Sequence, residues 1–146
     1  MIRPIPYATD AALLVARVAV GIVFTAHGWQ KLRDFGHTGT TQSFDAMGVP
    51  LPSVSAYYST WVELLGGVAL ILGVLTPIAG LLLFFDMLGA FLIVHAGNGI
   101  FSSEGGYEAV LTLGAISLAL VLAGAGRFSV DGFARRSTRH PATTSV

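Results

Sequence analysis

The stretch that decides the fold is YYSTWVELLGGVALILGVLTPIAGLLLFFDMLGAFLIVHA, residues 57–96. It contains two apolar runs, 57–75 and 78–96, separated by a short break with glycine before it and proline in it. Each run is close to the ~20 residues that a helix needs to cross ~30 Å of hydrocarbon. The stretch therefore predicts two transmembrane helices joined by a tight turn.

Two further apolar runs, at about 11–32 and 107–125, flank this pair. Of the 146 residues only 11% are charged and 53% are hydrophobic, with a mean hydropathy of +0.73. Soluble domains average ~25% charged residues, so this chain cannot cover a soluble surface. We predict an all-α membrane protein whose four-helix transmembrane bundle occupies residues 1–132. Residues 133–146 are polar and are expected to form a disordered cytoplasmic tail.

The connection between the first two runs is long for a compact bundle. Thr40 or Thr41 is a candidate cap for a short helix that ends near Met47 and has one apolar side. We expect an amphipathic external helix, which either lies along the outer membrane surface or plugs the outer mouth of the bundle.

Basic residues predict the orientation, because cytoplasmic ends of membrane helices are rich in lysine and arginine. The side of the termini holds Arg3, Arg127, Arg135, Arg136 and Arg139. The other side holds Lys31 and Arg33. Both termini are therefore expected in the cytoplasm.

Charge and cysteine content exclude several classes of function. The net charge of +0 lacks the basic footprint of a nucleic-acid binder. The absence of cysteine excludes disulfides, thiol catalysis and thiolate-bound metals. Membrane lipid is the expected surrounding, and a homo-oligomer is compatible with the sequence.

Ionisable residues inside the apolar runs are the candidate functional groups. They are Arg17, His27, Glu63, Asp86, His95 and Glu108. Each such group costs ~2.5–3.5 kcal/mol on insertion scales, so it needs a partner or a purpose. Estimated depths predict a buried Arg17–Asp86 ion pair and an outer layer that contains the other four. His95 follows Asp86 by nine positions, on the opposite face of a regular helix, so one common site requires a distorted helix.

Within the outer layer, His27 and Glu63 form the most informative pair. A carboxylate that orients a histidine serves in a proton relay, in hydrogen bonding to a quinone head or in a metal site. No metal site is predicted, because such a site wants three or four ligands within reach.

Several short motifs together resemble those of the DoxX family. They are HGWQKL (27–32), VELLGG (62–67), LGVLT (72–76), HAGNG (95–99), GGYE (105–108) and GRFSVD (126–131). The resemblance spans about residues 11–132 and implies a four-helix protein of bacterial or archaeal type in the inner (plasma) membrane of the cell. Its relatives are usually described as candidate oxidoreductases. One branch of the family is the membrane subunit of a thiosulfate:quinone oxidoreductase. Another is associated with a superoxide dismutase and a sulfurtransferase, and others with resistance to quinones and catechols.

We therefore favour a membrane subunit of a redox or redox-defence system that binds a quinone in the outer half of the bundle. His27 and Glu63 are the candidate catalytic residues. The candidate ligand-binding residues are Trp29, Lys31, His95, Asn98 and Glu108. The alternative is a non-enzymatic scaffold or assembly factor for redox or secreted partner proteins. A small-solute or metal channel ranks third, because four helices leave little room for a pore without oligomerisation.

Overall fold

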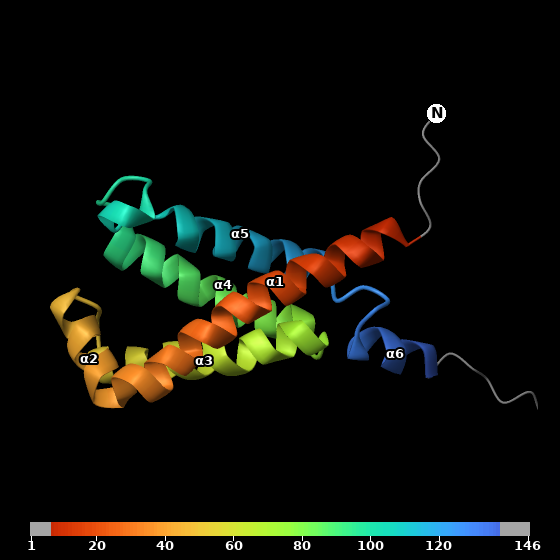
Figure 1. The fold of residues 1–146 in the computed structure, drawn as a ribbon, viewed down its shortest axis with the longest axis horizontal. Coiled ribbons are helices and arrows are strands. Elements are labelled where there is room, and N and C mark those ends of the chain that lie inside the picture. Colours follow the sequence, from red (N-terminus) through yellow and green to blue (C-terminus); the bar gives the residue numbers. More distant parts are fainter. Residues whose placement is uncertain (1–6, 138–146) are drawn as a thin grey trace, which may run out of the picture.

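The computed structural model describes residues 7–137, which are helical with no strand among them (Figure 1). Its helices are α1 (Ala8–Gln30), α2 (Gly36–Ala46), α3 (Pro52–Leu72), α4 (Thr76–Ala90), α5 (Glu108–Ala123) and α6 (Val130–Ser137). Helix α1 packs along α3, and α4 packs along α5. The start of α1 and the whole of α6 lie at one end of the bundle, which we call the terminal end. The opposite end carries α2, and we call it the α2 end.

Three helical segments are long and apolar enough to cross a membrane, which confirms the first three predicted apolar helices in outline. They are Ala8–Ala46, Pro52–Leu72 and Thr76–His95. Helix α5 is the fourth apolar helix, and with 16 residues it is shorter than predicted. Helix α3 begins at Pro52, before the predicted start at 57, because proline suits the first turn of a helix.

The segment predicted as a disordered tail begins as a helix. Residues 133–137 belong to α6, so this part of the prediction is wrong, while residues 138–146 lie outside the described residues. Asp131 explains why the chain is ordered here, because its carboxylate accepts bonds from the backbone N–H groups of Leu75 (3.0 Å) and Thr76 (3.1 Å). These N–H groups lie at the start of α4, where a helix has no internal acceptor for them. Arg3 and Arg139, both used to predict the orientation, also lie outside the described residues.

Arg17 links α1 to α3 and to the segment after α5 at the terminal end. The predicted ion pair between Arg17 and Asp86 is wrong. The guanidinium is buried and donates to the carbonyl oxygens of Leu70 (3.0 Å), Ile71 (2.7 Å), Ala125 (3.2 Å) and Phe128. The last carbonyls of a helix lack intrahelical partners, and a guanidinium offers five N–H donors in a fixed fork. Carbonyls near the end of α3 and in the segment between α5 and α6 therefore satisfy the hydrogen-bond donors of this arginine.

Glycines bring α1 and α3 into close contact. A Cβ added to Gly28 would collide with the backbone of Leu64, and one added to Gly67 would lie 2.6 Å from the Thr25 nitrogen. Small residues at such positions allow membrane helices to approach closely. This contact fixes the position of the last turn of α1 against α3.

We expect Gly28→Ala to destabilise the protein by about 1–3 kcal/mol, because the added methyl group must push the two backbones apart. Thermal unfolding in mild detergent measures the loss. Gly89→Ala is the matched control, because a Cβ at Gly89 would meet no atom within 4 Å. Equal melting temperatures for the two variants would contradict the close contact.

Candidate functional site

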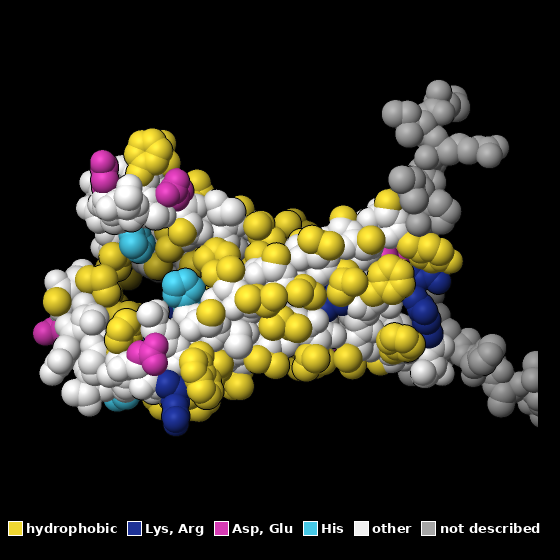
Figure 2. Space-filling model, viewed as in Figure 1, with side chains coloured by type: hydrophobic (Ala, Val, Ile, Leu, Met, Phe, Trp, Pro, Cys, Tyr) yellow, Lys and Arg dark blue, Asp and Glu magenta, His cyan; other side chains and the backbone are white. Residues whose placement is uncertain are grey.

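A cavity of about 620 Å³ lies inside the α2 end of the bundle. Its apolar walls include Phe24 of α1, Met87 of α4 and Leu113 of α5. Figure 2 shows a hollow at this end of the molecule, with histidine side chains beside it. The volume falls within the ~300–1,000 Å³ of small-molecule sites, which are also mostly apolar with a few polar groups.

The polar groups of the cavity come from three helices and the two segments that extend α1 and α4. Besides Ser55 and Ser102 at its edge, the cavity is lined by the polar residues His27, Lys31, Tyr58, Ser59, Glu63, Asp86 and His95. Four of the six ionisable residues singled out in the apolar runs are among them, since only Arg17 and Glu108 lie elsewhere.

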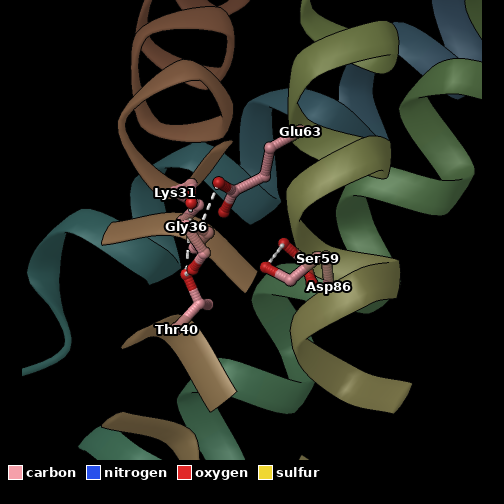
Figure 3. A network of polar contacts seen from close by, with 6 residues as sticks. All are labelled: Lys31, Gly36, Thr40, Ser59, Glu63 and Asp86. Atoms are coloured by element: carbon pink, nitrogen blue, oxygen red, sulfur yellow. Dashed lines mark hydrogen bonds and ion pairs between the residues drawn. The ribbon is translucent and has the colours of Figure 1, made fainter. Parts of the chain in front are cut away.

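An ion pair between Lys31 and Glu63 is the central polar contact (Figure 3). The exposed fractions of the two side chains are 17% for Lys31 and 5% for Glu63. The predicted partner of Glu63 was His27, but no hydrogen bond joins those two side chains in the described chain. Lys31 lies four positions after His27 and has a longer, more flexible side chain, so its ammonium reaches the carboxylate.

Asp86 brings a second carboxyl group into the cavity. The Ser59 hydroxyl donates to Asp86 Oδ2 at 3.3 Å, and the Asp86 carboxyl interacts electrostatically with both Glu63 and Lys31. Figure 3 shows Ser59 and Glu63 on neighbouring turns of α3, with Asp86 beside Ser59. A second carboxyl group thus lies close to the Lys31–Glu63 ion pair, inside the same cavity.

Two π-helical turns, Lys31–Phe35 and Phe91–His95, shape the α2 end. A π-turn advances less around the helix axis per residue than an α-helix does, and such turns are frequent at functional sites. The second one follows Ala90 and brings His95 to the same cavity as Asp86. This is the helix distortion that the sequence required for a common site.

The first π-turn fixes the position of Lys31. It joins α1 to α2, and the Thr40 hydroxyl lies 3.3 Å from the Lys31 carbonyl oxygen and 2.9 Å from that of Gly36 (Figure 3). Thr40 was predicted as a possible cap, but α2 begins at Gly36 and Thr40 lies inside it, where it is buried. The buried threonine therefore anchors the backbone that carries the lysine.

Helix α2 and the residues just after it lie over the cavity. Of the two positions predicted for the external helix, this one corresponds to a helix that plugs the mouth of the bundle. Phe44 of α2, and Met47 and Val49 just after it, line the cavity. Their apolar side chains form the wall of the cavity at the α2 end.

Three predicted ligand-binding residues are not among those that line the cavity. Trp29 is 54% exposed and stacks with the guanidinium of Arg33. The Asn98 side chain donates to the Val94 carbonyl (3.1 Å), and Glu108 accepts from the Ser102 N–H (2.7 Å), so both order the loop before α5. His95 also contacts this loop, through a 2.6 Å hydrogen bond from Nδ1 to the Gly105 carbonyl.

Tyr58 and Ser59 are site residues that the sequence reasoning missed. Ser59 lies four positions before Glu63 on α3 and therefore shares its face, which was the signal that could have found it. Tyr58, five positions before Glu63, carries no such signal. Within residues 7–137, no three His, Asp or Glu side chains are grouped closely enough to hold a metal ion.

The fold and the cavity define a multi-pass helical membrane protein with a charged pocket between its helices. The chain belongs to the DoxX family, whose sequence model matches residues 12–96. The family assignment made from the short motifs is thereby confirmed.

Named relatives agree with this assignment. "Putative oxidoreductase CatD" of Bacillus subtilis (strain 168) is 36% identical over 111 residues, 76% of this chain and 79% of that protein. "Inner membrane protein YqjF" of Escherichia coli (strain K12) is 35% identical over 127 residues, which cover 84% of this chain and 91% of that protein. "Inner membrane protein YphA" of the same organism is 27% identical over 129 residues, which cover 85% of this chain and 91% of that protein. No solved structure is significantly similar to the chain. These relatives and the apolar helices identify a multi-pass inner membrane protein.

Proposed function

We propose that this protein is the quinone-binding membrane subunit of a redox system. The observation that carries the proposal is the Lys31–Glu63 ion pair beside Asp86, inside an apolar cavity of about 620 Å³. The name of the Bacillus subtilis relative, "Putative oxidoreductase CatD", supports the same class of activity.

The residues of the cavity fit the chemistry of a quinone. A quinone has a flat apolar ring with two carbonyl oxygens, which accept hydrogen bonds and become hydroxyl groups when two electrons and two protons are added. Lys31 and His27 can donate to such oxygens, and Phe24 and Met87 offer apolar surface to the ring. Glu63 holds the lysine in place through the ion pair, and Asp86, which accepts a hydrogen bond from Ser59, places a second carboxyl group in the cavity.

The electrons come from a partner redox protein in this proposal. The chain has no cysteine and therefore cannot pass them through a dithiol. Partners of the sulfurtransferase or superoxide dismutase type are the ones that the family resemblance implies.

The proposal includes the placement of the chain in the membrane. Helix α5, with 16 residues, would be the fourth span, because ~1.5 Å per residue and a few flanking apolar residues nearly cross the hydrocarbon. Both termini would lie in the cytoplasm, because Arg127, Arg135 and Arg136 lie at the terminal end. The cavity then lies in the outer half of the membrane.

Extraction of the protein in native-lipid discs, without detergent, tests the proposal. We expect about one quinone per chain in the organic extract, or saturable uptake of added quinone by protein that was purified empty. Protein that neither retains quinone nor takes it up would overturn the proposal. The scaffold function would then be the better account.

A further inference from the structure

Helices α1 and α5 are joined at the terminal end and separate toward the α2 end (Figure 1). At the terminal end, Arg17 of α1 donates to the Ala125 carbonyl, and Asp10 of α1 accepts from the Arg127 N–H at 2.8 Å. At the α2 end, His27 of α1 and Ala109 of α5 both line the cavity and are both exposed. The cavity thus opens sideways between α1 and α5, at the hollow of Figure 2.

The route along the bundle axis is covered instead. Phe44, Met47 and Val49 lie over the cavity at the α2 end. The loop before α5 is held by the bonds from His95 to the Gly105 carbonyl and from the Ser102 N–H to Glu108. A ligand that reaches Lys31 from water would have to displace these segments, whereas the side opening is present in the structure as it stands.

We propose that the opening between α1 and α5 is a lateral portal to the bilayer, and that the ligand is a quinone with a long isoprenoid tail. The head lies at Lys31 and Glu63, and the tail leaves between His27 and Ala109 into the lipid. This inference rests on the proposed function and adds to it the substrate class, a lipid-soluble quinone in place of a water-soluble one.

The position of the opening explains why the tail matters. The helices on both sides are apolar over their lengths, so lipid hydrocarbon is the medium that faces the gap. A tail that extends through the gap stays in an apolar environment while the head contacts the charged groups. A tail that pointed toward the α2 end would meet the covering segment and, beyond it, water.

Closing the portal tests the inference. Ala109→Trp places a large side chain in the gap, and Ala115→Trp is the matched control, because Ala115 is exposed on α5 and does not line the cavity. Binding of a tailed quinone and of its tail-less head group is measured for each variant in lipid discs. We expect Ala109→Trp to weaken binding of the tailed quinone at least about tenfold and binding of the tail-less one less than about twofold. Ala115→Trp should change neither affinity.

A second variant removes the risk that tryptophan disturbs folding. The natural chain has no cysteine, so Ala109→Cys and Ala115→Cys can be folded first and then modified with a bulky thiol reagent. Selective loss of the tailed quinone after modification at 109 supports the portal. An unchanged affinity, an equal loss for both quinones, or an equal loss at 109 and 115 would overturn it. If the wild-type protein binds neither quinone, the proposed function itself fails.

Discussion

Glu63→Gln should lower quinone-dependent turnover by about 10²–10⁴-fold, the usual effect of removing a group that positions or transfers a proton. Glutamine keeps the size of the side chain and removes its charge. The Lys31 ammonium then loses its anionic partner, and the cavity keeps a single carboxyl group, Asp86. The measurement is steady-state quinone reduction in lipid discs with an artificial electron donor.

Two controls separate this effect from misfolding. Breaking a buried ion pair at one side leaves an uncompensated charge, whereas replacing both members by apolar residues is often neutral for stability. We therefore expect Lys31→Met/Glu63→Leu to restore the melting temperature without restoring turnover. Glu104→Gln removes an exposed carboxylate that does not line the cavity and should leave turnover unchanged. Undiminished turnover in Glu63→Gln would remove this residue from the mechanism.

Arg17→Met should be the most destabilising single substitution in the terminal end. It removes the donor of all the hydrogen bonds to the Leu70, Ile71, Ala125 and Phe128 carbonyls. A buried acceptor left without a partner costs about 1–3 kcal/mol, so we expect a total loss of at least about 3 kcal/mol. Since proteins are stable by only about 5–15 kcal/mol, much of the protein should unfold or aggregate in detergent.

Arg17→Lys should recover part of this loss. Lysine keeps the charge but cannot reproduce the planar fork that reaches several carbonyls at once. Thermal unfolding in mild detergent gives the order wild type, Arg17→Lys, Arg17→Met. Arg33→Met is the control, because Arg33 is exposed at the α2 end. If Arg17→Met melts at the same temperature as Arg33→Met, Arg17 does not hold the helix ends together.

The sequence predicts the apolar helices well, because a helix that spans a membrane must be of a certain length and predominantly apolar. It also identifies Glu63, Asp86, His27 and His95, since an ionisable group in an apolar run is conspicuous. Lys31 was found through the family motif HGWQKL instead. The sequence showed only that His95 and Asp86 could line one site if the helix were distorted, and it did not predict the distortion itself. A π-turn depends on how the helix packs against its neighbours, and residues 91–95 carry no local signal for it.

The partners of the charged groups are harder to predict than the groups themselves. Opposite charge suggested Asp86 for Arg17, but backbone carbonyls are invisible in a sequence and compete at every helix end. A carboxylate next to a histidine suggested His27 as the partner of Glu63, but the long side chain of Lys31 reaches Glu63 instead. Helix ends and side-chain reach are three-dimensional properties, which explains both errors.

Photolabelling tests the central claim most directly. A tailed azidoquinone is bound to the protein in lipid discs and irradiated, and the labelled residues are mapped by mass spectrometry. The account predicts labels on residues that line the cavity, such as His27, Tyr58 and Ala109, and their loss when excess unlabelled quinone is present. Labels spread over lipid-facing positions such as Leu118 and Leu122, and not reduced by competition, would contradict it.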